Sequence, residues 1–261
     1  MTLRIGVAAT APLGADVLER LAGEHEVAWL LTRLDAPQGR GRKLGPPPAK
    51  LVAEQLGIPV HQPEKPELPG DVDRVVVCAY GLYIPPSLLA RSVWLNVHPS
   101  LLPRWRGAAP VERAILTGDE QTGVTIHETV EALDAGPIAA QETFEIGDLD
   151  AGQVYARSAE IAARLLNDVI ESPTFTAQSE TGAIYAEKIT AADRELNLDD
   201  PLDAWRRVRA LSPHIGARGE LHGRRVTIWK ACLEDGTFVP EVVQPEGKNQ
   251  MGYDEFLRGL R

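Results

Sequence analysis

The sequence is poor in cysteine and has no long apolar run. Its 261 residues include only two cysteines, Cys78 and Cys232, which lie far apart and form no CxxC pair. This spacing argues against a disulfide framework and a structural zinc site. No run of about 18 uncharged apolar residues is present, so we expect no transmembrane helix. The opening MTLRIGVAAT lacks the apolar stretch and cleavage site of a signal peptide, which predicts a cytosolic protein.

Positive charge is also scarce. The formal net charge is −10 at pH 7, which argues against non-specific binding of nucleic acids. Any contact with RNA therefore requires a local basic patch. One such patch lies in a Gly- and Pro-rich stretch over residues 33–50, with a net charge of 5 − 1 = +4. Its charged residues are Arg33, Arg40, Arg42, Lys43 and Lys50 against Asp35.

Strand-like and helix-like segments alternate in the first half of the chain. The pattern predicts an α/β domain with a mostly parallel sheet. Apolar runs predict strands at 3–9, 27–32, 58–61, 75–79 and 94–98, and helical patterns follow or separate them around 17–21, 49–56 and 86–90. The first loop lacks the GxGxxG pattern, so dinucleotide binding has no support.

The pattern changes after residue 120. Two strands at 123–130 and 137–144 predict a hairpin added to the sheet, and a helix capped by Asp150 is expected to run to about Ile170. Residues 172–190 have the composition of a linker. The remainder predicts a helix at 201–211, short antiparallel strands at 218–221, 224–232 and 238–243, and a terminal helix at 253–260.

The stretch with the clearest chemistry is Asn96-Val97-His98-Pro99, at the end of a predicted strand. Residues two apart on a strand point to the same side, and the carboxyl ends of parallel strands carry the sites of open α/β sheets. An amide and an imidazole converging on one point suit a developing oxyanion. Asp134, in a loop flanked by glycine, is placed to orient His98 and favour its charged form. Taken alone, each feature also fits an ordinary strand end or turn.

Together, Asn96-Val97-His98-Pro99-Ser100-Leu101-Leu102-Pro103 and Leu133-Asp134-Ala135-Gly136-Pro137 resemble the signatures of the folate-dependent formyltransferases. The resemblance implies a Rossmann-like catalytic domain and formyl transfer from 10-formyltetrahydrofolate, without a metal. It assigns catalysis to Asn96, His98 and Asp134. It also implies that the folate lies against residues 80–85 and 130–136. The implied folate contacts are Tyr80, Leu82, Ile84, Ser100, Leu101, Leu102, Pro103, Leu133 and Gly136, although core packing explains Leu82 and Ile84 equally well.

Three features resemble the branch of this family that formylates methionyl-initiator tRNA. They are the basic loop around Arg40, the continuation Trp105-Arg106-Gly107-Ala108-Ala109-Pro110, and a tail with Tyr185-Ala186-Glu187-Lys188-Ile189. The resemblance implies tRNA contacts at Arg40, Arg42, Lys43, Arg104 and Arg106. It also implies a role in translation initiation, with no obligate protein partner evident.

The resemblance divides the chain into a catalytic domain at 1–175, a linker at 176–195 and a tRNA-binding-type domain at 196–261. The last is shorter than the family pattern, so we expect a trimmed β-barrel-like domain. The first loop, Ala8-Ala9-Thr10-Ala11-Pro12-Leu13-Gly14, also departs from the family pattern, which leaves the lining of the aminoacyl pocket open. Two alternatives remain: a formyltransferase for another amine, such as an amino-sugar nucleotide, and a non-catalytic folate- or RNA-binding relative.

Overall fold

The computed structural model describes residues 3–38 and 43–260. The chain divides into two compact units, each assembled from separate stretches of sequence. The first unit comprises residues 1–106, 123–143 and 156–184, and the second comprises residues 107–122, 144–155 and 185–261. Within the described residues, no helix is long and apolar enough to cross a membrane.

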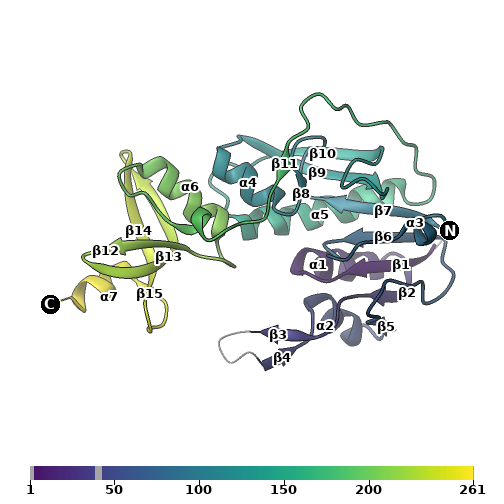
Figure 1. The fold of residues 1–261 in the computed structure, drawn as a ribbon, viewed down its shortest axis with the longest axis horizontal. Helices are drawn as coiled ribbons and strands as arrows, with labels where there is room; N and C mark the ends of the chain where they lie inside the picture. The colour runs from purple at the N-terminus through teal and green to yellow at the C-terminus, as the bar shows by residue number, and fades with distance from the viewer. Residues whose placement is uncertain (1–2, 39–42, 261) are drawn as a thin grey trace. The chain divides into compact units, whose positions relative to one another are not determined.

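A seven-stranded sheet forms the framework of the chain (Figure 1). Its strands are β1 (Arg4–Ala9), β2 (Glu26–Leu31), β5 (Val60–His61), β6 (Arg74–Cys78), β7 (Val93–His98), β9 (Gln121–Glu128) and β10 (Ile138–Glu145). The spatial order is β10-β9-β7-β6-β1-β2-β5. The five strands from β7 to β5 are parallel, and β9 pairs antiparallel with β7. The mostly parallel α/β sheet with an added hairpin is therefore confirmed.

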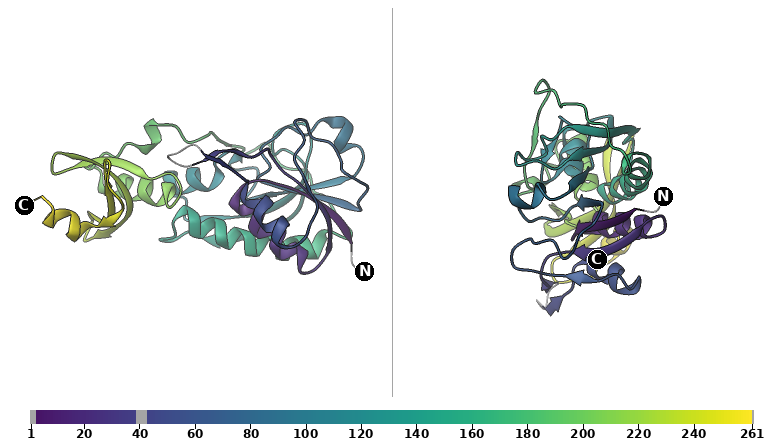
Figure 2. Two further views of the ribbon diagram at one scale, coloured as in Figure 1. Left: turned by 90° about the horizontal axis from the view of Figure 1, so that it is seen from below. Right: turned by 90° about the vertical axis from the view of Figure 1, so that its right-hand side faces the viewer.

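Helices α1 (Pro12–Ala22) and α5 (Ala151–Val169) lie on the same side of this sheet (Figure 2). An ion pair between Arg20 and Glu160 joins them. The apolar stripe of α1 is buried, as its periodicity predicts. Asp150 caps α5 as expected, because its Oδ1 accepts from the N–H of Gln153 while Gln153 Oε1 accepts from the N–H of Asp150. The shorter helices α2 (Pro48–Gln55) and α3 (Pro86–Leu89) follow β4 and β6 in sequence.

The opposite face of the sheet carries an aromatic core. Trp29 and Trp94 pack there with Val75 and Val77. Asn96 is the register partner of Val77, and strand residues in register share a face. The side chains of Asn96 and His98 therefore start from this face, away from α1 and α5.

The second unit contains a smaller sheet in the order β12-β13-β14-β15, with antiparallel pairing throughout. Its elements are α4 (Pro110–Thr117), β11 (Tyr185–Ala186), the 3-10 helix η1 (Ala192–Arg194), α6 (Pro201–Leu211), β12 (Ala217–Leu221), β13 (Arg224–Glu234), β14 (Thr237–Pro245), β15 (Met251–Gly252) and α7 (Tyr253–Arg258). The four described strands are arranged linearly, with β12 and β15 at the edges, so this sheet is open within the described residues.

The sequence did not predict three local elements of the structure. The stretch read as a loop contains a hairpin of β3 (Ala36–Gln38) and β4 (Lys43–Gly45). The short strand β8 (Arg106–Gly107) pairs with β11, inside the stretch read as a linker. Helix α4 was also missed, although Pro110 stands at its first turn and Gly118 ends it in the left-handed conformation.

Candidate active site

Two neighbouring antiparallel strands bring four polar side chains to one face of the sheet. Asn96 on β7 lies directly across from His127 on β9, and His98 lies across from Thr125. Both pairs keep the same side-chain direction because residues two apart on a strand point the same way. The rigid sheet thus fixes the spacing of these groups before any loop contributes.

Asp134 comes to this face from the loop between β9 and β10. Its Oδ1 accepts a hydrogen bond from Asn96 Nδ2 at 3.3 Å, and its Oδ2 lies 3.7 Å from His98 Nδ1. Only 9 % of the Asp134 side chain is exposed. The structure therefore brings together the three residues to which the motifs pointed, in a place where electrostatic interactions are weakly screened.

The proton arrangement on His98 follows from its partners. His98 Nε2 lies 2.7 Å from the carbonyl oxygen of Trp105, and a carbonyl only accepts, so Nε2 carries a proton. Nδ1 faces the Asp134 carboxylate, which also only accepts when ionised. His98 is thus held between the Trp105 carbonyl on one side and the Asp134 carboxylate on the other.

His127 is a functional candidate that the sequence analysis missed. Its Nδ1 donates to the carbonyl of Glu128 at 2.9 Å, which leaves Nε2 as an acceptor for Asn96 Nδ2 at 3.1 Å. Burial, and secondly the charge of His98, lower the pKa of His127 to about 4. A neutral His127 and the Asp134 carboxylate both demand a donor, so together they fix the NH2 end of the Asn96 amide toward them.

We expect the buried His127 to make folding pH-dependent. Its folded pKa is about 4, against about 6.5 when exposed. The contribution of His127 to the free energy of unfolding is then fully present above about pH 6.5. It is lost as the pH falls toward 4, because only the unfolded chain takes up a proton in this window.

Urea unfolding at pH 7 and pH 4.5 measures this loss of unfolding free energy, which should be smaller in His127→Gln. The control His222→Gln alters an exposed histidine and should keep the wild-type loss; equal losses in all three proteins would contradict the prediction.

The Asp134 loop is closely docked on β9. Asp134 has a φ of +49°, a conformation that side-chain-bearing residues rarely adopt. A Cβ on Gly136 would lie 1.8 Å from the carbonyl oxygen of Glu128, so no other residue fits there without movement. Glu128 also donates its N–H to the carbonyl of Pro137 at 2.9 Å. The glycine of the second motif thus has a packing role that its resemblance to a turn did not reveal.

The side chains predicted to contact folate lie mainly in the interior. Tyr80 and Ile84 belong to the aromatic core and are 2 % and 7 % exposed, with Leu82 packed against that core. Burial raises the pKa of Tyr80 to about 12. Leu133, beside Asp134, is instead 62 % exposed. A ligand at this edge would therefore meet Leu133 and backbone groups rather than the side chains of Tyr80 and Ile84.

The Ser100–Pro103 turn is tied to β9 through Thr125. The Thr125 hydroxyl donates to the carbonyl of Ser100 at 2.7 Å and accepts from the N–H of Leu102 at 3.2 Å. Ser100 and Leu102 are buried, whereas Leu101 and Pro103 are half-buried, and the Leu102–Pro103 peptide is cis. This turn carries the chain from His98 to the Trp105 carbonyl that holds it.

The basic residues predicted to contact tRNA fall into three groups. Arg40 and Arg42 lie outside the described residues. Lys43 is exposed on β4, and the half-buried Arg104 lies over the ring of Trp105 at 4.5 Å. Arg106 is only 2 % exposed and is engaged by Gln178 and Glu180. A buried, partnered guanidinium does not suit a phosphate contact, so Arg106 is withdrawn from that group.

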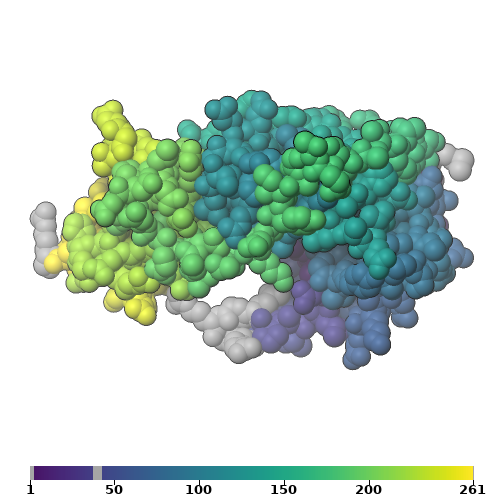
Figure 3. All heavy atoms as spheres, turned by 45° about the horizontal axis from the view of Figure 1, so that its top comes forward, coloured from purple at the N-terminus to yellow at the C-terminus, as the bar shows by residue number. Residues whose placement is uncertain are grey.

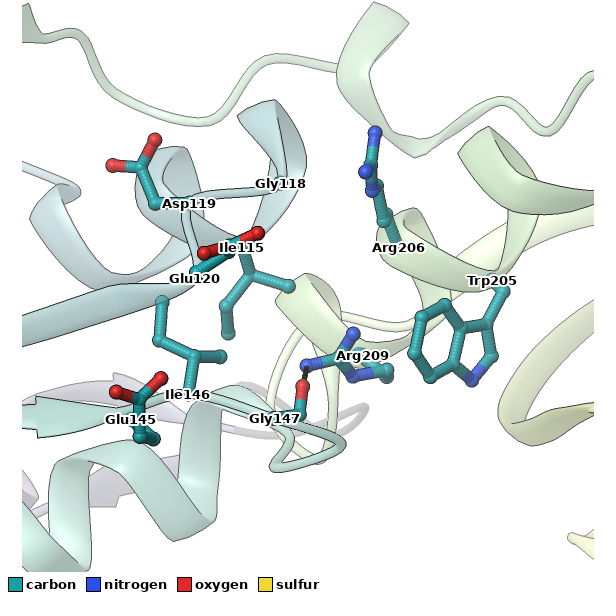
Figure 4. A pocket seen from close by; sticks show the side chains of 10 residues that line it. All are labelled: Ile115, Gly118, Asp119, Glu120, Glu145, Ile146, Gly147, Trp205, Arg206 and Arg209. Carbon is teal, nitrogen blue, oxygen red and sulfur yellow. Dashed lines mark hydrogen bonds between the residues drawn. The ribbon is translucent and has the colours of Figure 1, made fainter.

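A separate pocket of about 290 Å³ lies in the second unit, between α4 and α6 (Figure 4). Arg209 stacks on Trp205 and donates to the carbonyl of Gly147, a bond drawn in Figure 4. Three carboxylates, Asp119, Glu120 and Glu145, line the pocket with the two arginines Arg206 and Arg209. The mixed charges of the lining and the bonded Arg209 give this pocket a structural character.

Comparison with known proteins identifies the family of the chain. Residues 5–170 match the family model described as formyl transferase. The methionyl-tRNA formyltransferase of Cereibacter sphaeroides (strain ATCC 17025 / ATH 2.4.3) is 36 % identical over an alignment of 295 positions, covering 99 % of this chain and 96 % of that protein.

Two solved structures show a similar fold. HypX from Aquifex aeolicus in complex with tetrahydrofolic acid has a TM-score of 0.71 at 20 % identity, covering 98 % of this chain and 47 % of its own. Methionyl-tRNA formyltransferase from Clostridium thermocellum has a TM-score of 0.66 at 13 % identity, covering 93 % of this chain and 98 % of its own.

Proposed function

The chain belongs to the formyl transferase family, and we propose that it transfers the formyl group of 10-formyltetrahydrofolate to the amino group of methionyl-initiator tRNA. The observation that carries the chemistry is the buried meeting of Asn96, His98 and Asp134 on one face of the sheet. The observation that supports the acceptor is 36 % identity to a methionyl-tRNA formyltransferase over nearly the whole of both chains.

The reaction needs a stabilised oxyanion and one proton transfer. The amine nitrogen attacks the formyl carbon, a C–N bond forms, and the carbonyl electrons move onto oxygen. The bond from carbon to N10 of the folate then breaks, the carbonyl reforms, and the proton lost by the amine passes to N10. Donors held in place before the reaction stabilise the charged oxygen without reorganisation.

Asn96 and His98 supply those donors. The Asn96 amide has two N–H bonds, one directed to His127 at 3.1 Å and one to Asp134 at the longer distance of 3.3 Å. The longer bond is the weaker one, so its hydrogen is the one available to a developing oxyanion. In this scheme His98 donates the second hydrogen bond through Nδ1, which lies 3.7 Å from Asp134 Oδ2, because Nε2 is already bonded to the Trp105 carbonyl.

Asp134 has two tasks in this scheme. Its carboxylate holds His98 and Asn96 in place, and it accepts the amine proton directly or through one water before N10 receives it. No covalent bond between protein and formyl group is required.

The acceptor site must bind a polyanion although the whole chain is acidic. The net +4 of residues 33–50 supplies local positive charge, and Lys43 is exposed within it. Arg40, Arg42 and Arg104 complete the proposed set of contacts. Because charged tRNA is used in translation initiation, this activity would place the protein in the cytosol.

Formyl transfer to charged initiator tRNA, free methionine and an amino-sugar nucleotide tests the acceptor. We expect activity on the tRNA, with binding that weakens by roughly a hundredfold between 50 and 200 mM salt if about four phosphates are contacted. Lys43→Glu should raise the KM for tRNA, whereas Lys65→Glu, at another exposed lysine, should not. Activity confined to the small amines would instead identify a different formyltransferase, and absence of any transfer would favour a non-catalytic relative.

A further inference from the structure

The segment that follows α5, residues 171–184, contacts β10 and the Asp134 loop. Residues 171–184 run over the surface of the first unit (Figure 3), and Thr176 forms a β-bridge with Ile138 at the start of β10. Both backbone bonds of the bridge are short, at 2.7 and 2.9 Å. The bridge brings the next residues of the segment beside the loop that carries Asp134.

Gln178 joins this segment to the Asp134 loop with both ends of its amide. Its Nε2 donates to the carbonyl of Asp134 at 2.8 Å and to the carbonyl of Gly136 at 2.6 Å. Its Oε1 accepts from Nε and Nη2 of Arg106, at 3.2 and 2.9 Å. These four bonds use both hydrogens and both lone-pair directions of the amide, so neither end is free to rotate.

Arg106 anchors this arrangement. Its guanidinium is buried, and a buried charge is costly unless it is hydrogen-bonded. Glu180 also pairs with it at 3.2 Å, but the Glu180 side chain is 80 % exposed and solvent weakens that pair. Gln178 is therefore the better shielded of the two partners. The positive charge of Arg106 also reaches the site itself, because it contributes to the lowered pKa of His127.

The Asp134 loop needs such support. With Asp134 in the left-handed region, the backbone is strained and persists only where its surroundings hold it. Gly136 docks on β9 from one side, and Gln178 binds the two carbonyls that flank Ala135.

We propose that Gln178 is a positioning residue that, anchored by Arg106, holds the Asp134 loop in its catalytic geometry. We call the contact of Gln178 with both Arg106 and the Asp134 loop the clamp. The inference rests on the proposed function, since the clamp supports the site to which that function is assigned. It predicts that breaking the contact between Gln178 and the loop lowers turnover through Asp134, even when the segment stays attached to Arg106.

Gln178→Glu separates the two ends of the clamp. A carboxylate still accepts from Arg106, but it cannot donate and places negative charge against the Asp134 and Gly136 carbonyls. We expect kcat to fall between about ten- and a hundredfold, the cost of a small misplacement of a reacting group. The matched control is Glu180→Gln, which alters the other partner of Arg106 and should stay within about twofold of wild type.

A double-mutant cycle distinguishes positioning from general weakening. If Gln178 acts through Asp134, Gln178→Glu should cost no more than about twofold in an Asp134→Asn background. Two results overturn the inference. One is a double variant whose loss of kcat equals the product of the losses in the two single variants, and the other is a Gln178→Glu single variant with wild-type kcat. If Gln178→Glu does not fold, Gln178→Asn keeps the amide but is one methylene too short to reach both partners, and the same expectations apply.

Hydrogen exchange tests the clamp without using activity. The Ala135 N–H donates to the carbonyl of Ala132 within the loop, so its exchange reports on loop opening. It should exchange faster in Gln178→Glu than in wild type and Glu180→Gln, and an unchanged rate overturns the proposal. A wild-type protein that formylates no amine would refute the proposed function, and the exchange result would then decide separately whether Gln178 holds the loop.

Discussion

Asp134→Ala is expected to lower turnover at least about a hundredfold while the protein stays folded. The Asp134 carboxylate lies against both motif residues, 3.3 Å from Asn96 Nδ2 and 3.7 Å from His98 Nδ1. Its removal takes away the acceptor that orients the Asn96 amide, the carboxylate that faces His98 Nδ1, and the proposed route for the amine proton. All three losses act on the transition state, so kcat should fall more than KM rises.

The measurement is steady-state formyl transfer with saturating tRNA and folate, with thermal unfolding as the check of folding. Glu131→Ala is the matched control, because Glu131 is an exposed carboxylate in the same loop. It should retain nearly wild-type turnover. Asp134→Asn should resemble Asp134→Ala, since an amide keeps the size of the side chain but not its charge. Near-normal turnover in both Asp134 variants would remove Asp134 from the mechanism.

The sequence predicts the framework well because its signals are local. The apolar run at 75–79 predicted a strand, and β6 occupies Arg74–Cys78. Val17, Leu18 and Leu21 have helical spacing, and they lie on the buried face of α1. The pairing of Asn96 with His98 follows from the period of a strand alone. Asp134 is 38 residues from Asn96 in the chain. Its loop suggested an orientation toward His98, but its membership of the same site as Asn96 came from the family resemblance.

The missed parts of the site depend on contacts between distant segments. His127 lies on a strand whose Val124 and Ile126 point to one face. Strand alternation therefore predicts that His127 points to the other face, but it does not predict that Asn96 is its partner there. Gln178 and Arg106 are 72 residues apart, and no periodicity reports such a pair. Local composition gave residues 172–190 the character of a linker, because a single amide that makes four bonds has no compositional signature.

Arg106 is a residue whose burial the sequence did not indicate. The resemblance of Trp105-Arg106-Gly107 to the tRNA branch of the family implied a tRNA contact at Arg106, yet its side chain is buried. A sequence does not show whether an arginine is exposed to solvent or hydrogen-bonded inside the protein. Here the partners are an amide and a carboxylate of the same unit. In the structure, Arg106 is connected through Gln178 to the backbone of the Asp134 loop.

Asn96→Ala is expected to lower kcat between about a hundred- and a thousandfold, the usual result of removing one oxyanion donor. Asn96→Asp should be as severe, because a carboxylate of the same size offers no N–H and faces Asp134, 3.3 Å from the present amide nitrogen. The KM values for tRNA and folate should stay within about threefold, since the lost bond forms fully only in the transition state.

A second amide–histidine pair provides the control for Asn96. Asn167 on α5 accepts from His25 at 3.0 Å, on the helical side of the sheet. Asn167→Ala therefore breaks a bond like that of Asn96 and His127, but away from the catalytic face, and should leave kcat near wild type. Single-turnover formyl transfer by the three variants makes the comparison. Equal losses in Asn96→Ala and Asn167→Ala would mean that general loosening of the domain, rather than a missing oxyanion donor, limits the rate.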